Sequence, residues 1–472
     1  MWRRGAGKEG QAAPGDAKVT VAGVKLAASD ARLGLPVEQF AAVAKTLCGF
    51  PSFFAAPLFR RISLAFGRCR FADGEAGITG GAAPVRYPLP KQPAHRPVAP
   101  SADEGGPAVG EGGLRETAGE VQLYQFLRFW RSEIEPYDHY DRFLRLVSQR
   151  GAAVLPTKRK LSYRALVPTD FMPLLEELLA FHPGLAFLEN TPEFQEKYAR
   201  TVIGRIFFKL DPTARQCINS RALRQSDLLH AFHTVDMEED INLVNEYFSY
   251  EHFYVLYCKF WELDADHDFF LSREDLSKLT DLTQVALDRV FEQAGRPFTS
   301  DQKNRMAYED FIAFLMSEED KTAPEAIRYW FGVVDLDGDG VLSPQDMRVF
   351  YAEQHARMQE LGMEAVSFQD LMTQMTDLLK PDVPAHFELK DFLDPTRVKL
   401  TGVLFSCLFN ISKFQAFEAR DAVLVKQQLN SEGISQWDRF ASVEYMRLAE
   451  EEEGGIEDNM SFEVDGSAEG RW

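Results

Sequence analysis

The stretch Asp335-Leu-Asp-Gly-Asp-Gly-Val-Leu-Ser-Pro-Gln-Asp346 places carboxylates at positions 1, 3, 5 and 12 of a twelve-residue window. A hard divalent cation prefers about six to eight oxygen ligands at roughly 2.3–2.6 Å, so carboxylates must converge from a tightly curled backbone. Gly340 at position 6 permits the left-handed turn that such a curl requires. A solvent-exposed Asp/Gly turn is the alternative interpretation, but the complete pattern favours a calcium site.

This spacing is that of an EF-hand calcium loop, except that the last position is usually Glu. The predicted ligands are four carboxylates and the carbonyl oxygen at position 7: Asp335, Asp337, Asp339, Val341 and Asp346. Ser343 at position 9 is expected to act through a water molecule. Because Asp is one methylene shorter than Glu, we expect weaker or more Mg²⁺-tolerant binding than in a loop that ends in Glu.

A second window repeats this arrangement earlier in the chain, which gives up to two bound Ca²⁺ ions. Its predicted ligands are Asp264, Asp266, Asp268, Phe270 (carbonyl oxygen) and Asp275, with Ser272 as the water-mediated position. Position 6 is Phe269 rather than glycine, and a left-handed conformation costs a non-glycine residue roughly 1–2 kcal/mol. We predict a strained or differently curved loop that still binds calcium. The alternative is a hand that its helices hold without metal.

EF-hands pair through a short two-stranded ribbon at position 8. Each of the two loops predicted to bind calcium, here called working loops, therefore needs a partner. Degenerate loops that keep an apolar position 8 and an acidic position 12 begin near Thr299 and Lys380, and a further vestige spans Asp211–Ala222. They lack the full acid set at positions 1, 3 and 5, so we predict that they fold as hands without binding metal. Helical periodicity is nearly continuous from about 121 to 450. The predicted fold is all-α: an elongated helical protein of tandem EF-hand cassettes, in which working loops pair with degenerate ones.

Composition divides the rest of the chain, because small, polar or proline-rich stretches cannot bury a core. The predicted parts are a disordered leader (1–32), an N-terminal helical segment with a hydrophobic motif (33–66), a disordered Gly/Pro/Ala-rich insertion (67–118), a helical domain with a degenerate hand (119–240), two EF-hand cassettes (241–320 and 321–400), C-terminal helices (401–448) and a disordered acidic tail (449–472).

Bulk properties exclude several functions. A formal net charge of −20 over 472 residues argues against a nucleic-acid partner. No apolar run approaches the roughly 18 residues of a membrane span. Five cysteines without a CxxC pair favour reduced thiols in an intracellular protein. The sequence has no nucleophile elbow, phosphate-binding glycine loop or histidine-rich metal set, so we expect no enzymatic activity of its own.

Several runs carry a family resemblance, foremost Phe248-Ser-Tyr-Glu-His-Phe-Tyr-Val-Leu-Tyr-Cys-Lys-Phe-Trp-Glu-Leu-Asp264. Shorter runs add to it: His182-Pro-Gly-Leu-Ala-Phe-Leu, Thr191-Pro-Glu-Phe-Gln-Glu, Glu239-Asp-Ile-Asn, Ser317-Glu-Glu-Asp-Lys, Tyr329-Trp-Phe and Trp437-Asp-Arg-Phe. From about 160 to 450, and over Leu33–Phe59, the sequence resembles the B'' (PR72-type) regulatory subunits of protein phosphatase 2A. The insertion over 67–118 departs from relatives, in which a degenerate hand follows the Pro-Leu-Phe motif closely.

The resemblance implies a non-catalytic subunit that joins the phosphatase scaffold and catalytic subunits and selects phosphoprotein substrates. It implies a cytoplasmic location, with nuclear or cytoskeleton-associated pools as alternatives. The predicted partner-binding residues are apolar or aromatic: Phe50, Phe53, Phe54, Leu58, Phe59, Phe253, Tyr257, Phe260 and Trp261. From the residues alone, the segment over 50–59 is either a docking surface or the core of a small helical unit. The alternative function is a free-standing EF-hand calcium sensor or buffer.

Overall fold

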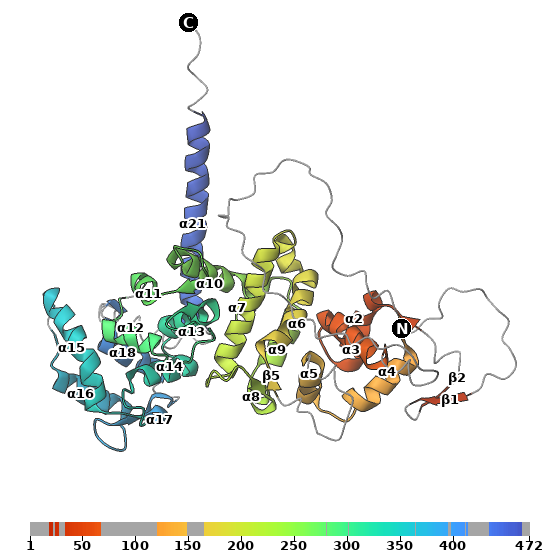
Figure 1. Cartoon of the computed structure of the whole chain (residues 1–472), viewed down its shortest axis with the longest axis horizontal. Coiled ribbons are helices and arrows are strands. Elements are labelled where there is room, and N and C mark those ends of the chain that lie inside the picture. Colours follow the sequence, from red (N-terminus) through yellow and green to blue (C-terminus); the bar gives the residue numbers. More distant parts are fainter. Residues whose placement is uncertain are drawn as a thin grey trace, which may run out of the picture. The chain divides into compact units, whose positions relative to one another are not determined.

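The structure is a computed structural model that describes residues 18–21, 24–27, 34–67, 120–148, 165–279, 281–300, 302–363, 365–394, 398–410, 412–413 and 434–464. The chain forms two compact units: the first contains residues up to Gly49 and Ala55–Pro136, and the second contains Phe50–Phe54 and Tyr137–Trp472. Helices dominate both units (Figure 1). The strands described in these ranges form five two-stranded antiparallel sheets.

The first unit contains a short ribbon between β3 (Gly34–Leu35) and β4 (Val121–Gln122). Its other elements are β1 (Lys18–Val21), β2 (Val24–Ala27), η1 (Val37–Gln39), α2 (Phe40–Val43), the π-helical η2 (Ala44–Cys48), α3 (Ala55–Gly67), α4 (Leu123–Phe129) and the π-helical η5 (Trp130–Ile134). The ring of Phe40 lies 5.4 Å from that of Phe59 and 6.4 Å from that of Phe126. Residues 120–136, expected within the domain over 119–240, therefore pack with the N-terminal segment instead.

The second unit starts with a hand pair whose ribbon joins β5 (Ala165–Leu166) to β6 (Ile218–Asn219). Its helices are η3 (Ser52–Phe54), α5 (His139–Val147), α6 (Pro168–Phe181), η7 (Pro183–Leu188), α7 (Pro192–Leu210), α8 (Ser220–Gln225), α9 (Leu228–Val235) and η8 (Ile241–Leu243). The rings of Phe53 and Phe54 lie 6.0 and 5.8 Å from that of Phe232. The upstream segment over 50–54 therefore completes the core of this pair.

Two further hand pairs contain the predicted working loops. One ribbon joins β7 (Phe270–Leu271) to β8 (Met306–Ala307), and the other joins β9 (Val341–Leu342) to β10 (Phe387–Glu388). The helices are α10 (Tyr250–Leu263), α11 (Arg273–Leu279), α12 (Gln284–Phe291), α13 (Tyr308–Glu319), α14 (Pro324–Val334), α15 (Pro344–Glu360), α16 (Phe368–Leu379), α17 (Leu389–Phe392), α18 (Val398–Phe409) and α21 (Gln436–Val464). The predicted pairing of each working loop with a degenerate loop downstream is confirmed.

Four of the ribbons share one packing rule: an apolar residue lies opposite another, and in the three ribbons of the second unit both residues stand at position 8 of their loops. The opposed pairs are Leu35 with Val121, Leu166 with Ile218, Leu271 with Met306, and Leu342 with Phe387. Each of these side chains is at most 1% exposed. Burying one such side chain contributes about 1.5–3 kcal/mol to the stability of the folded protein. The ribbons therefore join paired strands by apolar packing as well as by backbone hydrogen bonds.

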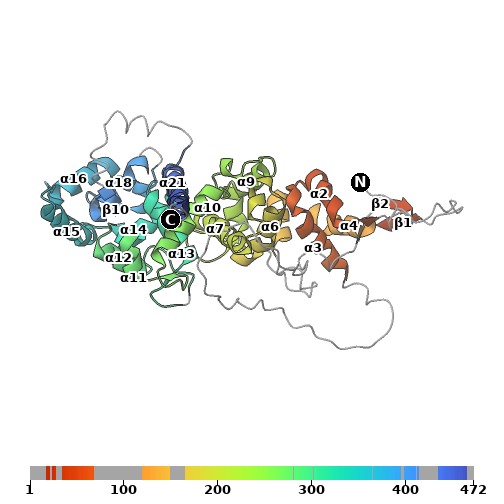
Figure 2. The same ribbon diagram turned by 90° about the horizontal axis from the view of Figure 1, so that it is seen from above.

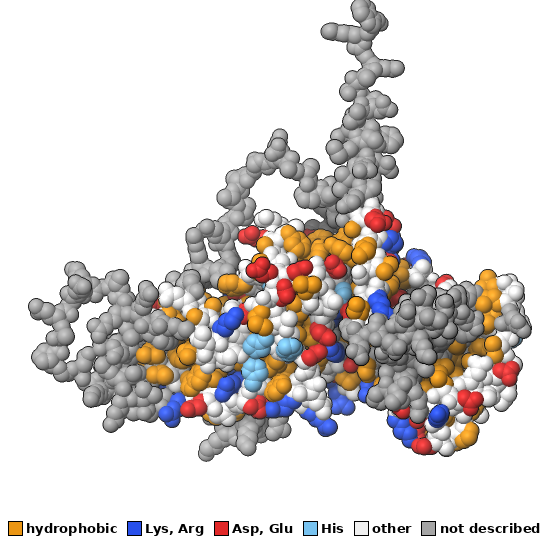
Figure 3. Space-filling model, turned by 180° about the vertical axis from the view of Figure 1, so that it is seen from behind, with side chains coloured by type: hydrophobic (Ala, Val, Ile, Leu, Met, Phe, Trp, Pro, Cys, Tyr) orange, Lys and Arg blue, Asp and Glu red, His pale blue; other side chains and the backbone are white. Residues whose placement is uncertain are grey.

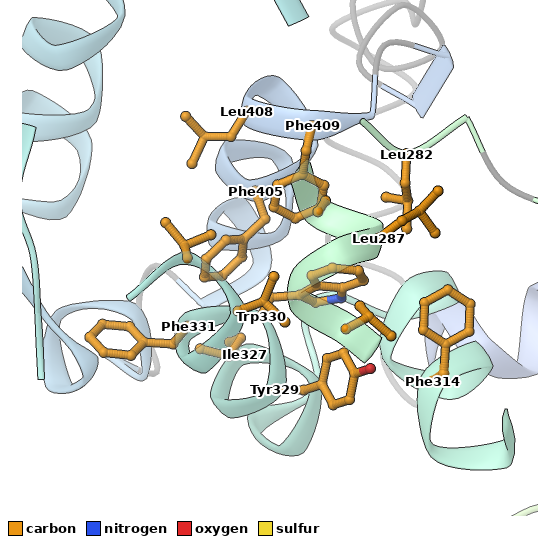
Figure 4. Close-up of a cluster of buried hydrophobic side chains, with 14 of the residues drawn as sticks. Leu282, Leu287, Phe314, Ile327, Tyr329, Trp330, Phe331, Phe405, Leu408 and Phe409 are labelled. Carbon is orange, nitrogen blue, oxygen red and sulfur yellow. The ribbon is translucent and has the colours of Figure 1, made fainter. Parts of the chain in front are cut away.

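The two pairs with working loops share one continuous hydrophobic core around Trp330 of α14 (Figure 4). The Trp330 ring lies 4.7 Å from that of Phe409 in α18 and 6.3 Å from that of Phe314 in α13. Its indole N–H donates to the carbonyl oxygen of Ser317 at 2.7 Å. Helices α13, α14 and α18 therefore meet at this one side chain.

A buried ion cluster lies beside this core. The Glu318 carboxylate is 2.6 Å from the ammonium of Lys321 and 3.2 Å from that of Lys413, and it accepts a hydrogen bond from the Asn410 side chain at 2.7 Å. Burial acts to raise the pKa of Glu318, but the two lysines more than offset it and hold that pKa below its usual value. The charged Glu318 of α13 thus connects this helix to the residues that follow α18.

Helix α21 packs against α10, as Figures 1 and 2 show, and a buried polar cluster fixes their contact. His252 Nδ1 accepts from the Arg205 guanidinium at 2.9 Å and from the indole N–H of Trp437 at 3.3 Å. Burial, reinforced by the positive charge of Arg205, lowers the pKa of His252 to about 2. The imidazole is therefore neutral, as its two donors require.

Three stretches differ from the predicted organisation or lie outside the described residues. Part of the leader forms the β1–β2 hairpin, whose alternating Val19, Val21, Val24 and Leu26 favour strands. Helix α21 continues through the predicted acidic tail to Val464, because glutamates are good helix formers and Arg447 pairs with Glu451 one turn on. Apart from Gly67, the insertion predicted over 67–118 lies outside the described residues, as do the rest of the leader and residues 465–472.

No single helix among the described segments is long and apolar enough to cross a membrane, although the bent pair Phe40–Cys48 and Ser52–Ser63 reaches that threshold by length and composition together. On the face shown in Figure 3, acidic and basic side chains are interspersed among apolar and uncharged ones.

Candidate calcium sites

The loop from Asp335 to Asp346 gathers its first three carboxylates at one point. Oxygen atoms of Asp335, Asp337 and Asp339 lie within 4.8 Å of one another. The backbone N–H groups of Gly338 and Gly340 donate to the two oxygens of Asp335 at 2.9 and 3.0 Å. Gly340 has φ +85°, the left-handed conformation that its position requires. Hydrogen bonds from the loop's own peptide groups therefore maintain its tight turn.

The last positions complete an all-oxygen ligand set. Asp339 Oδ1 accepts the N–H of Val341 at 2.8 Å, and Asp346 Oδ2 accepts the N–H and the hydroxyl of Ser343 at 2.9 and 2.5 Å. Within the described part of the chain, no lysine or arginine forms an ion pair with the four aspartates of this loop. Four carboxylates without a counter-ion, and with hard oxygen donors only, fit Ca²⁺.

The loop from Asp264 to Asp275 repeats this geometry. Oxygen atoms of Asp264, Asp266 and Asp268 lie within 4.8 Å of one another. Asp264 accepts the N–H groups of Asp268 and Phe269 at 3.2 and 2.9 Å. Burial raises the pKa of Asp264, which makes its negative charge costly without a nearby cation.

Phe269 adopts the left-handed conformation in the place of glycine. Its φ is +64°, close to the +85° of Gly340, so the loop keeps the usual curl and Phe269 bears the strain. Packing compensates for part of this cost: the Phe269 ring lies 6.2 Å from that of Trp261, and its face is 3.7 Å from the Lys197 ammonium. Of the two predicted alternatives, strain is confirmed and different curvature is wrong.

Basic side chains distinguish this loop from the loop at Asp335. The Arg305 guanidinium lies 2.6 Å from Asp268 Oδ2, and it also donates to the carbonyl oxygen of Phe270 at 3.2 Å. The Lys278 ammonium lies 2.9 Å from Asp275 Oδ1. The other oxygen, Asp275 Oδ2, accepts the N–H and hydroxyl of Ser272 at 3.1 and 2.7 Å.

The residue at position 12 caps a helix as well as serving as a potential ligand. The degenerate loops near Thr299 and Lys380, called silent loops from here on, show this capping. Asp310 accepts the N–H of Ala307 at 3.1 Å, and Asp391 accepts that of Glu388 at 2.9 Å. Asp310 also accepts the N–H of Thr299 at 2.7 Å, so it closes its loop from the first to the ninth residue without metal. An acid at position 12 is therefore no evidence of metal binding on its own.

The second unit contains a further degenerate hand, with strand β5, that was not predicted from the sequence. Leu166 stands at position 8, and Asp170 at position 12 accepts the N–H of Val167 at 2.9 Å. The signal was an apolar residue followed four positions later by Asp-Phe, because Leu166–Phe171 matches Met306–Phe311 and Phe387–Phe392 in this respect. In the first unit Gln125 takes the same capping role for Gln122, at 2.9 Å.

Most predicted partner-binding side chains are core residues. At most 3% of each of the following is exposed: Phe50, Phe53, Phe54, Leu58, Phe59, Phe253 and Phe260. The segment over 50–59 is therefore core and not a docking surface, because its rings fill the interiors of hand pairs. Tyr257 and Trp261 are half-buried. Their rings stack on each other at 6.2 Å, and Trp261 stacks on His267 of the loop at 4.2 Å.

Comparison with known proteins agrees with this geometry. An EF-hand domain model matches residues 138–238, and a model of an EF-hand domain pair matches residues 253–352. Both ranges contain ribbons described above. The chain is thus a helical protein of tandem EF-hand pairs.

Its relatives define the family. A probable B''epsilon regulatory subunit of protein phosphatase 2A from Arabidopsis thaliana is 37% identical over 91% of this chain and 70% of its own length. The probable B''delta regulatory subunit of the same plant is 43% identical over 69% of this chain, which spans 61% of that relative, and the human B'' alpha regulatory subunit is 39% identical over 74% of this chain and 30% of its own length. A chain of a solved PP2A PR70 holoenzyme is 40% identical with a TM-score of 0.53, covering 59% of this chain and 99% of that one. The protein belongs to the B'' family of protein phosphatase 2A regulatory subunits.

Proposed function

We propose that this chain is a calcium-binding, non-catalytic subunit that joins the scaffold and catalytic subunits of protein phosphatase 2A. It would direct serine/threonine dephosphorylation to particular phosphoprotein substrates and locations. The supporting observation is the likeness to the PR70 holoenzyme chain, 99% of which is covered at 40% identity. The relatives' names, all regulatory subunits, agree with a role that is not catalytic.

Calcium binding is proposed at up to two loops, over 264–275 and 335–346. When bound, the ion would supply positive charge that holds the converging carboxylates together. Asp at position 12 favours affinities in the sensor range, about 10⁻⁷–10⁻⁵ M, over the tightest buffers. The ion can stiffen the angle between flanking helices only through a higher affinity for the stiffened state.

The surface beside the loop at Asp264 supports a partner-binding role, with the scaffold subunit as the proposed partner. Tyr257, Trp261 and His267 form a stacked, partly exposed ladder that runs from α10 into the loop. A calcium-stiffened loop would fix the end of this ladder at His267. We propose a cytoplasmic location for the assembled complex, with nuclear or cytoskeleton-associated pools as alternatives, which fractionation of cells would test.

Affinity capture of the tagged full chain from cells tests the proposal. Recovery of the phosphatase scaffold and catalytic subunits in comparable amounts is expected. Efficient recovery of the chain without either subunit, in calcium-containing buffer, would remove the proposed function and leave an EF-hand protein with another partner.

A further inference from the structure

Arg305 belongs to the silent loop near Thr299, yet its guanidinium lies among the predicted ligands of the partner loop. It contacts Asp268 Oδ2 at 2.6 Å and the Phe270 carbonyl oxygen at 3.2 Å, which are the ligand groups at positions 5 and 7. The other oxygen, Asp268 Oδ1, accepts the N–H of Phe270 at 2.9 Å. Both oxygens of Asp268 and the carbonyl at position 7 are therefore already engaged.

The ligand at position 12 is engaged in the same way. Asp275 Oδ1 lies 2.9 Å from the Lys278 ammonium, one helical turn further along α11. Two positive charges of the chain itself thus lie against two of the four carboxylates of the loop, Asp268 and Asp275. These two contacts relieve part of the repulsion among the carboxylates before any ion binds.

The loop at Asp335 provides the comparison, because the corresponding places carry other residues. His386 stands at position 7 of the silent loop near Lys380, as Arg305 does near Thr299, and its ring lies 3.1 Å from the carbonyl oxygen of Pro384 in its own loop. Val349 follows Asp346 by three residues, as Lys278 follows Asp275, and is 45% exposed.

We propose that Arg305 is a built-in competitor for calcium that sets the affinity of the loop at Asp264; this rests on the calcium binding proposed above. A cation at that loop needs the oxygens at positions 5 and 7, so it must displace the guanidinium or share those oxygens with a like charge. Because the number of uncompensated ligand charges tunes EF-hand affinity, the loop at Asp335 fills first and the loop at Asp264 fills at higher calcium. Arg305 thereby separates two similar loops into a high-affinity and a low-affinity site.

Calorimetric calcium titration of the full chain tests this, with one loop silenced at a time. In a background of Asp335→Ala with Asp337→Ala, Arg305→Gln should tighten binding at the loop at Asp264 by about three- to tenfold, since it removes one charge-assisted contact from two ligand groups. Arg305→Lys keeps the charge and should gain less. The matched control is His386→Gln in a background of Asp264→Ala with Asp266→Ala, and it should leave the affinity of the loop at Asp335 within about twofold.

Unchanged or weaker binding by Arg305→Gln would overturn the inference, because Arg305 would then be neutral or would support the ligands. Lys278→Gln provides a second variant, outside the ribbon, with an expected change in the same direction. Absence of binding at both loops in millimolar calcium would overturn the proposed calcium function itself. Binding at the loop at Asp335, with no effect of Arg305→Gln or Lys278→Gln at the other loop, would overturn this inference alone.

Discussion

Leu342 of β9 lies directly opposite Phe387 of β10, and both side chains are completely buried. The first belongs to a loop with a full set of acidic ligands and the second to a loop without one. A silent loop therefore contributes half of the ribbon against which a working loop is held. The same relationship joins Leu271 to Met306.

Truncating Leu342 should therefore affect both stability and calcium binding. We expect Leu342→Ala to lower the free energy of unfolding by about 2–5 kcal/mol, as measured by urea denaturation, because it opens a cavity in a closed core. Calcium affinity at the loop at Asp335 should fall as well. Val349→Ala, at an exposed site on the helix that leaves the same loop, should change stability by no more than about 0.5 kcal/mol. Equal effects of the two substitutions would contradict the role of the ribbon.

The buried carboxylate of Glu318 should be far more important for stability than a surface ion pair. Glu318→Ala leaves the buried Lys321 without its partner, so we expect a loss of about 3–5 kcal/mol in the free energy of unfolding. Glu292→Ala is the control, because it breaks an exposed pair with Arg289 at 3.0 Å and should cost less than about 1 kcal/mol. Thermal and urea unfolding of both variants would decide, and a Glu318→Ala variant as stable as wild type would contradict the account.

Stability should decrease between about pH 7 and pH 5 through His252. Burial and the charge of Arg205 lower its pKa to about 2 in the folded protein, against 6.5 for an ordinary histidine. Between these pH values the unfolded chain binds more protons than the folded one. The stability that depends on the neutral His252 is therefore fully present above pH 6.5 and is lost as the pH falls, at up to about 1.4 kcal/mol per pH unit. His252→Gln should reduce the loss over that interval by about 1–2 kcal/mol in urea denaturation. His386→Gln changes an exposed histidine and should have the same pH dependence of stability as the wild-type protein. Identical pH profiles for the wild-type protein, His252→Gln and His386→Gln would exclude His252 as the cause.

The two loops should differ in their importance for assembly. Because the Tyr257–Trp261–His267 ladder enters the loop at Asp264, Asp264→Ala with Asp266→Ala should reduce capture of the scaffold subunit more than Asp335→Ala with Asp337→Ala. A severalfold difference in apparent affinity is expected in a pull-down at saturating calcium. Equal losses would show that the first of these loops has no special position in the interface.

The sequence predicted the working loops well because their chemistry is local. Twelve consecutive residues carry the acids, the turn at position 6 and the apolar residue at position 8, and the structure brings these together as expected. The silent partners near Thr299 and Lys380 were also predictable, since position 8 and position 12 survive for reasons of packing and capping.

The features of the fold and of the sites that were not predicted depend on contacts between residues far apart in the sequence. The pairing of Leu35 with Val121 spans the insertion, so the ribbon of the first unit could not be predicted from a continuous pattern. The contact of Arg305 with Asp268 depends on the register of β7 and β8, which no local spacing specifies. The aromatic run over 50–59 had the composition of a docking motif, and only the surrounding helices show that its rings are core.

Reconstitution from purified components tests the central claim most directly. The full chain is mixed with purified scaffold and catalytic subunits in calcium, and the products are separated by size-exclusion chromatography with light scattering. We predict a single peak with the mass of a one-to-one-to-one complex. Elution of the chain apart from a scaffold–catalytic dimer, at micromolar concentrations and saturating calcium, would contradict the account.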